Sequence, residues 1–150
     1  MEGTFIMTKV ELDKKISNVR TEINEEEARL AKLEEMLEVL LTFSSQCQKK
    51  SDSFFASVQK RKNKLFSISY MIDTVKAISS YSSCMSELLN GQSYNEAKKS
   101  IDAIMEKNEA KKKSLKNDIE DTEKIIKQLK AELNHLQNQD YDEVVGEGNG

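Results

Sequence analysis

The sequence predicts an all-α protein, a long antiparallel helical hairpin or coiled coil, from three observations. Apolar residues recur at alternating spacings of four and three, which is the heptad pattern of a coiled coil. The 150-residue chain contains no proline, and Gly91 is its only glycine between Gly3 and Gly146. Charged residues make up 33% of the chain and aromatic residues 6%, which favours narrow helical seams over a broad globular core. We therefore expect one helical domain over residues 8–138.

The first helix is expected to begin at residue 8, after a disordered lead over 1–7. Thr8 and Glu11 have the spacing of a capping box, and Met7 and Leu12 are placed as its hydrophobic staple. An apolar seam then extends to residue 40 with Glu26 as its one interruption. We call these residues the N-terminal seam: Leu12, Ile16, Val19, Ile23, Leu30, Leu33, Leu37 and Leu40.

The sequence leaves open whether this helix continues beyond residue 44. The same register can be carried through small and polar residues, as one continuous first arm over 8–89 would require. Its positions are Ser44, Cys47, Ser51, Phe54, Val58, Arg61, Leu65, Ile68, Ile72 and Val75. However, residues 44–53 contain four serines, and Ser45 with Gln48 could form another capping box. The alternative is a three-helix bundle with a break near 44–53.

The chain is predicted to reverse at Asn90-Gly91. Asn and Gly tolerate the left-handed conformation that ends a helix. Ser93 and Glu96 then have the spacing of a capping box for the next helix. The predicted turn comprises Leu89, Asn90, Gly91, Ser93 and Glu96.

A return helix is predicted over 94–138, followed by a disordered acidic tail over 139–150. The tail is rich in glycine and acidic residues and carries too little apolar surface to fold. The apolar stripe of the return helix comprises Tyr94, Ala97, Ile101, Ile104, Leu115, Ile119, Ile126, Leu129, Leu133 and Leu136.

A reversal at residues 90–91 would leave the N-terminal seam uncovered. Antiparallel partners would then have residue numbers that add to about 181, so 92–136 would cover 45–89 and nothing would cover 8–44. Because a long apolar stripe is rarely left in water, another chain or a further fold must cover it. The predicted partner-binding residues are Ile16, Val19, Ile23, Leu30, Leu33, Leu37 and Leu40.

The sequence predicts no catalytic, cofactor-binding or metal-binding site. His135 is the sole histidine, and inward Glu-x-x-His pairs on facing helices, as a carboxylate-bridged metal site would need, are not present. Gly91 stands alone, so no glycine-rich loop could bind a phosphate. Cys47 and Cys84 are too far apart along the expected helices for a disulfide, which is typical of a reducing compartment. We therefore expect a protein that is not an enzyme.

Charge and hydropathy limit the classes of partner. The net charge is −3, yet residues 41–90 carry seven basic and three acidic residues, which favours an acidic protein surface as partner. The chain lacks the strongly basic balance and the recognisable module of a nucleic-acid-binding protein. No apolar run is long enough for a membrane span or a classical export signal.

The region of the predicted turn resembles a known family. Its residues are Val75-Lys76-Ala77, Tyr81, Met85 and Leu88-Leu89-Asn90-Gly91, followed by an amphipathic helix with Ile126, Leu129 and Leu133. Over residues 8–138 the chain resembles the small helical proteins associated with LXG toxins, within the WxG-type helical hairpins of type VIIb secretion systems. In that group the turn is Trp-x-Gly, whereas this chain has Leu89-Asn90-Gly91 and no tryptophan.

The resemblance implies a non-catalytic adaptor or chaperone, a targeting factor for secretion. Its partner would be the helical N-terminal domain of an LXG-type toxin or a sister helical protein. The family's export signal places an acid four residues after an aromatic residue, but Val145 follows Tyr141 at that spacing. The chain is thus expected in the cytoplasm, or exported with a partner through a Sec-independent system. The alternative function is a structural coiled coil that forms homo-oligomers.

Overall fold

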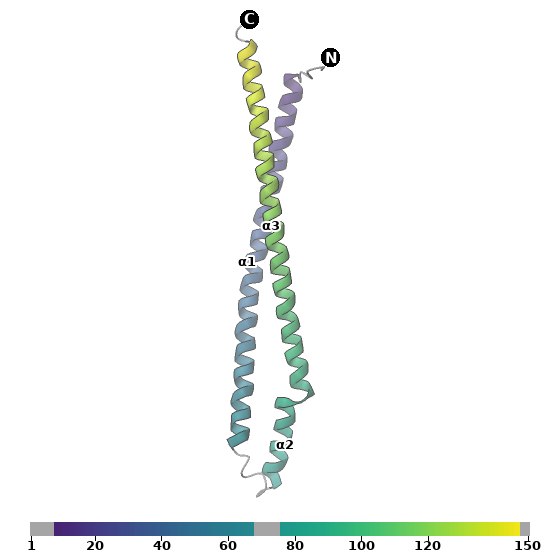
Figure 1. The fold of residues 1–150 in the computed structure, drawn as a ribbon, viewed down its shortest axis with the longest axis vertical. Helices are drawn as coiled ribbons and strands as arrows, with labels where there is room; N and C mark the ends of the chain where they lie inside the picture. The colour runs from purple at the N-terminus through teal and green to yellow at the C-terminus, as the bar shows by residue number, and fades with distance from the viewer. Residues whose placement is uncertain (1–7, 68–75, 148–150) are drawn as a thin grey trace. The chain divides into compact units, whose positions relative to one another are not determined.

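The computed structural model describes residues 8–67 and 76–147, and every described helix is an α-helix. The helices are α1 (Lys9–Ser67), α2 (Lys76–Asn90) and α3 (Gln92–Glu147), as Figure 1 shows. The described residues contain no strand. The all-α hairpin class is therefore confirmed. Predictions for the lead 1–7 and for Ile68, Ile72 and Val75 lie outside the described residues.

The start of α1 is the predicted capping box. The backbone N–H of Thr8 donates to Glu11 Oε2 at 3.4 Å, and that of Glu11 donates to Thr8 Oγ1 at 3.3 Å. The N–H of Leu12 then donates to the Thr8 carbonyl at 2.9 Å, which is the first helical hydrogen bond. The two side chains thus bond backbone donors that have no partner within the helix itself.

Helix α1 passes through residues 44–53 without a break, so the alternative of a break there is wrong. Gln48 does not form a cap with Ser45. Instead its Nε2 donates to Asp52 Oδ1 one turn later at 2.9 Å. Cys47 is half-buried and Ser51 is only 6% exposed, so the small seam residues pack as helical seam residues do. The continuous heptad register was the better guide to the helix than the local serines.

Gly91 is the site of a bend between α2 and α3, and the chain does not reverse there. The N–H of Gly91 donates to the Glu87 carbonyl at 2.6 Å, and the N–H of Asn95 donates to the Gly91 carbonyl at 3.1 Å. Both bonds have the i to i−4 spacing of an α-helix. No glycine within the described residues has a positive φ, so the predicted left-handed cap is wrong.

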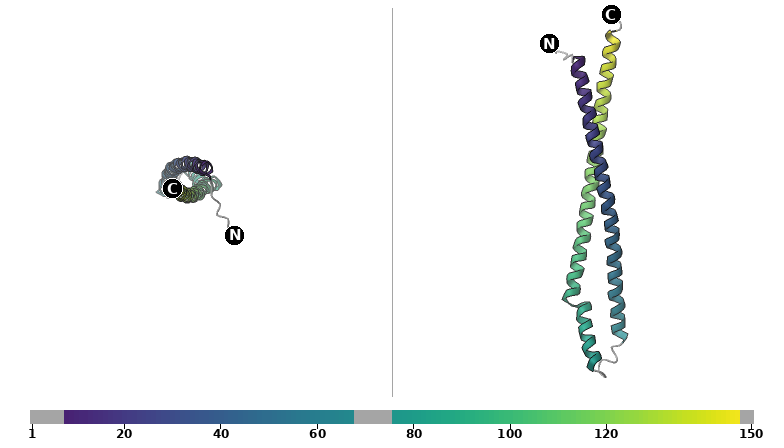
Figure 2. Two further views of the ribbon diagram at one scale, coloured as in Figure 1. Left: turned by 90° about the horizontal axis from the view of Figure 1, so that it is seen from above. Right: turned by 180° about the vertical axis from the view of Figure 1, so that it is seen from behind.

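The facing residues show where the chain reverses. Phe55 of α1 contacts Tyr94 of α3, with ring centroids 6.4 Å apart, and Val58 lines one hollow together with Leu89 of α2. Residue numbers of facing partners thus add to about 149, and not to the predicted value of about 181. The reversal therefore comes between the end of α1 and the start of α2, and α3 continues in the direction of α2 after the bend (Figures 1 and 2).

The chain divides into two compact units. Unit 1 comprises Met1–Leu37 with Ser114–Gly150, and unit 2 comprises Glu38–Lys113. Unit 1 contains a buried apolar cluster in which α1 residues pack against α3 residues. Its members are Leu12, Ile16, Val19, Ile23 and Leu136, with Leu129 and Leu133 packed against them.

This cluster corrects the idea of an uncovered seam. Ile16, Val19 and Ile23 are only 6–8% exposed and are covered by α3 of the same chain. The other residues of the proposed partner-binding set are half-buried: Leu30, Leu33, Leu37 and Leu40. With the reversal between α1 and α2 and not at 90–91, the return helix is long enough to reach the first turns of α1.

Helix α3 also continues farther than predicted, to Glu147, although the sequence placed its end near residue 138. No proline interrupts 139–147, and each residue added to a formed helix gains one hydrogen bond without the cost of a new nucleus. The acidic composition of this stretch was therefore a weaker signal than the absence of a helix breaker.

Candidate partner-binding groove

Small side chains occupy some seam positions of unit 2, and hollows lie beside the seam. Cys47 and Ser51 of α1 and Ala97 of α3 occupy seam positions. Such short side chains fill less of the space between two helices than the leucines and isoleucines of unit 1 do. Larger apolar residues next to the seam are exposed to solvent, among them Phe54 at 36% and Ile104 at 46%.

Three adjoining hollows follow α1 through unit 2, and we call them together the unit 2 groove. The first, of about 280 Å³, is lined by Cys47, Phe54, Ile101, Ile104 and Met105 among others. The second, of about 400 Å³, shares Phe54 and adds Val58, Leu88, Leu89 and Tyr94. The third, of about 580 Å³, shares Arg61 and Met85 with the second and adds Leu65 and Tyr81. The lining is mainly apolar in the first two.

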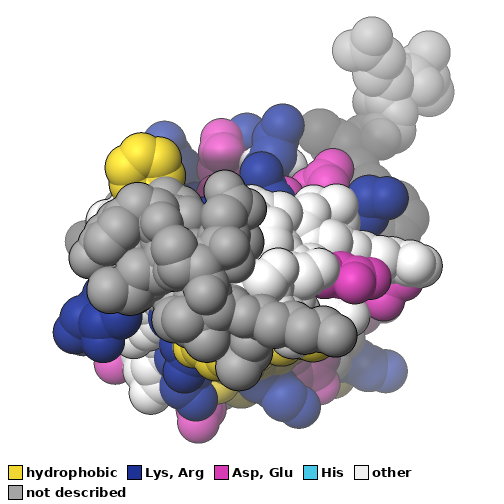
Figure 3. All heavy atoms as spheres, turned by 90° about the horizontal axis from the view of Figure 1, so that it is seen from below, with side chains coloured by type: hydrophobic (Ala, Val, Ile, Leu, Met, Phe, Trp, Pro, Cys, Tyr) yellow, Lys and Arg dark blue, Asp and Glu magenta, His cyan; other side chains and the backbone are white. Residues whose placement is uncertain are grey.

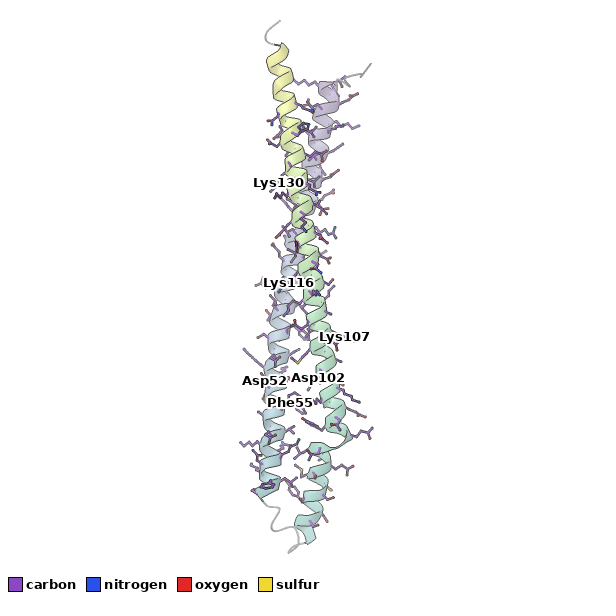
Figure 4. The ribbon with its side chains drawn as sticks, viewed as in Figure 1. Asp52, Phe55, Asp102, Lys107, Lys116 and Lys130 are labelled. Atoms are coloured by element: carbon purple, nitrogen blue, oxygen red, sulfur yellow. The ribbon has the colours of Figure 1, made fainter. Side chains whose placement is uncertain are left out.

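An aromatic cluster lies in the middle of this groove. Phe54 stacks on Tyr94 with ring centroids 6.4 Å apart, and Phe55 meets the same ring at an interplanar angle of 79°. The ammonium group of Lys62 lies 4.8 Å from the centroid of the Tyr94 ring. Figure 4 shows Phe55 on the side of α1 that faces α3. This cluster fixes the start of α3 against α1 next to the Gly91 bend.

The predicted turn residues form part of the groove wall. Leu89 is 5% exposed, and both Leu89 and Ser93 line the second hollow. Asn90 donates through Nδ2 to the Ser86 carbonyl at 3.2 Å. Glu96 accepts a hydrogen bond from Gln92 Nε2 at 3.0 Å, so the expected Ser93–Glu96 capping box is not what the structure shows. These residues thus shape a bend and a surface, and not a reversal.

Several seam positions differ from those that the heptad spacing predicted. Phe55 is half-buried where Phe54 was predicted, Lys62 where Arg61 was predicted, and Met105 where Ile104 was predicted. In α3, Lys112 and Thr122 occupy seam positions, and Thr122 is only 1% exposed. A strict alternation of three and four residues along α3 would have found Met105, Lys112 and Thr122, because polar residues at regular seam positions still face the partner helix.

The groove lies in the basic part of the chain. Unit 2 has thirteen basic and eight acidic residues, a net charge of +5, whereas unit 1 has ten basic and eighteen acidic residues, a net charge of −8. Lys50, Arg61 and Lys64 line the groove itself. Figure 3, seen from below, shows Lys and Arg side chains with Asp and Glu side chains among them and few hydrophobic side chains.

The described residues contain neither a cluster of metal ligands nor a helix that could span a membrane. Among them, no three His, Cys, Asp or Glu side chains come together as a metal site would require. Both cysteines are free thiols; Cys47 is half-buried and Cys84 is exposed. Within 8–67 and 76–147, no helix combines the length and apolarity that crossing a bilayer requires.

Comparisons with known proteins do not add to these observations. No family model, curated protein or solved structure matches the chain. The unit 2 groove is therefore the feature from which a function can be argued.

Proposed function

We propose that the protein is a non-catalytic helical adaptor that binds a helical segment of another protein in the unit 2 groove. One observation carries this proposal: a row of solvent-exposed apolar side chains follows the groove. Leu88 is 60% exposed, Tyr81 56% and Ile104 46%. Exposed apolar residues gathered along one hollow are typical of interaction surfaces, whereas single exposed apolar residues are ordinary.

The class of partner comes from the resemblance of the sequence to LXG-associated proteins. On that basis, the partner is the helical N-terminal domain of an LXG-type toxin, and the protein is its chaperone and targeting factor for type VIIb secretion. The chain would leave the cell only together with that partner. The binding surface in this proposal is the unit 2 groove, because the first half of the N-terminal seam, Leu12 to Ile23, is buried against α3 of the same chain and the second half is half-buried.

Co-expression with a toxin domain tests the proposal. The full chain would be produced together with the helical N-terminal domain of an LXG toxin encoded by an adjacent gene, and the mixture separated by size exclusion. We expect a stable complex that elutes ahead of both separate proteins. Separate elution of the two proteins would contradict the proposal.

A self-associating structural coiled coil is the second candidate, and the charge distribution favours it. Unit 1 is acidic and unit 2 is basic, so two copies could attract each other through unlike units. Sedimentation equilibrium of the isolated chain distinguishes the candidates. A stable homodimer or tetramer at micromolar concentration supports self-association, whereas a monomer supports the adaptor.

A further inference from the structure

We propose that the occupant of the unit 2 groove is an amphipathic helix of another protein whose apolar stripe is flanked by acidic residues. This inference rests on the proposed adaptor function and deepens it by giving the chemistry of the partner. It follows from three properties of the groove: its length, the apolar character of its floor and the charge of its lining.

The length of the groove fits one helix of moderate size. Along α1 the lining residues extend from Cys47 to Ser67. At a rise of about 1.5 Å per residue this stretch is about 30 Å long. A helix of about 20 residues, or between five and six turns, would therefore occupy the whole groove.

The lining favours a helix over an extended peptide. An extended segment has unpaired backbone N–H and C=O groups, which must find partners when buried. The floor of the first two hollows offers mainly carbon atoms from residues such as Phe54, Leu88 and Ile104. A helix bonds its own backbone, and its side chains can pack into the hollows between two antiparallel helices. It would complete a three-helix arrangement in unit 2.

The charge of the lining selects the polar face of that helix. Lys50 lines the first hollow, Arg61 the second and third, and Lys64 the third, so basic side chains follow the groove along its length. Arg61 is exposed and does not take part in any ion pair found within the described residues. Acidic residues beside the apolar stripe of the occupant would meet these cations, which raises both specificity and the rate of association.

A second copy of this chain fits the groove less well than a foreign helix does. The acidic half of the molecule is unit 1, whose α1 stripe is buried against α3 from Leu12 to Ile23 and half-buried from Leu30 to Leu37. Within the described part of unit 1, the large apolar side chains that remain exposed are Val10, Met36 and Ile125, which do not form a 20-residue stripe. The acidic helices of a second copy could therefore meet the cations but could not fill the hollows.

Two synthetic peptides test the inference with the full-length chain. Both probes are 21-residue helices with leucine at the a and d positions of three heptads. One has glutamate at the flanking e and g positions and the other has lysine. Fluorescence anisotropy of dye-labelled probes gives the dissociation constants. We expect the glutamate probe to bind at least about tenfold more tightly than the lysine probe.

Variants of the chain locate the binding site. The double variant Lys50→Glu with Arg61→Glu should weaken binding of the glutamate probe at least about tenfold and favour the lysine probe. The matched control, Lys98→Glu with Lys99→Glu, makes the same charge change on exposed residues of unit 2 that do not line the three hollows. Leu88→Ala should also weaken binding, whereas Ile125→Ala in unit 1 should not. Circular dichroism verifies that each variant remains folded.

Each result supports or overturns the inference. Equal affinity for the two probes, or equal effects of the groove and control variants, would overturn it. A homodimer that dissociates in the Lys50→Glu, Arg61→Glu variant would overturn it as well, because the occupant would then be a second copy. If the toxin domain still forms its complex with this variant, the adaptor function stands and the groove assignment fails. If no toxin complex forms with the unaltered chain either, the proposed function itself fails.

Discussion

Gly91 owes its role to a close approach of the backbone, and not to an unusual φ angle. A Cβ atom built on Gly91 would collide with the carbonyl oxygen of Glu87, the acceptor of the Gly91 N–H. In an ordinary helical position, replacing glycine by alanine stabilises a protein by about 0.5–1 kcal/mol. At this bend the added methyl group should instead lower the stability, since overpacking of this kind costs about 1–3 kcal/mol.

We therefore predict that Gly91→Ala lowers the melting temperature with little change in helix content. Circular dichroism at 222 nm provides both measurements. Asn95→Ala is the control, since it truncates a nearby exposed side chain without adding a Cβ atom. A higher melting temperature for Gly91→Ala would show that α2 and α3 join there as an ordinary helix.

Asn108 is a polar residue in the seam of unit 2 whose side chain lacks a partner. Its Nδ2 atom is buried and has no hydrogen-bond partner within the described part of the chain. Leaving such a donor unsatisfied costs about 1–3 kcal/mol. Asn108→Leu should therefore raise the free energy of unfolding in a urea titration, while Asn117→Leu at an exposed position should change it little. Loss of stability in Asn108→Leu would mean that the amide makes a bond the chain needs.

At the scale of the helices, the packing of α1 against α3 makes a prediction for the isolated chain. Ile16 is 8% exposed within the unit 1 cluster, whereas Val10 is 78% exposed one to two turns earlier. Truncating a buried isoleucine to alanine costs about 2–5 kcal/mol. We expect Ile16→Ala to lower the melting temperature of the chain alone and Val10→Ala to leave it nearly unchanged. Unaltered stability of Ile16→Ala, combined with weaker partner binding, would instead indicate an open seam.

The helices and their buried faces could be predicted from the sequence, but the position of the reversal could not. Heptad spacing located the buried side chains of α1 from Leu12 to Ser51, because a helical face depends only on local periodicity. Register between two helices depends on which distant residues meet, and no local pattern encodes that. Gly91 is the one strong turn signal in the chain, yet the reversal falls in a stretch without glycine or proline.

The site was harder to predict than the fold for a related reason. The groove arises where small seam residues such as Cys47, Ser51 and Ala97 come together from two helices. Their pairing depends on the register between the two helices. The numbers of the contacting residues Phe55 and Tyr94 add to 149, about 32 less than the predicted sum. The basic character of residues 41–90 was visible in the sequence and did indicate the half of the chain that contains the groove.

At the scale of the whole molecule, each unit carries an excess of one charge sign. Unit 1 has a net charge of −8 and unit 2 of +5, so like charges repel within each unit. Raising NaCl from about 10 mM to about 150 mM shortens the Debye length from about 30 Å to about 8 Å. We predict that the melting temperature rises over this range. The variant Glu25→Gln with Glu35→Gln should show a smaller rise. A fall would mean that ion pairs such as Glu27–Lys130, at 3.1 Å, outweigh the repulsion.

The antiparallel register also imposes an order on the folding reaction. Val58 and Leu89 are 31 residues apart in the sequence, whereas Leu12 and Leu136 are 124 residues apart. Closing the longer loop first would cost about 1.2 kcal/mol more in chain entropy, from the logarithmic dependence on loop length. The helices should therefore zip from residues near the reversal toward the termini. In stopped-flow kinetics, Val58→Ala should slow folding, while Ile16→Ala should chiefly accelerate unfolding.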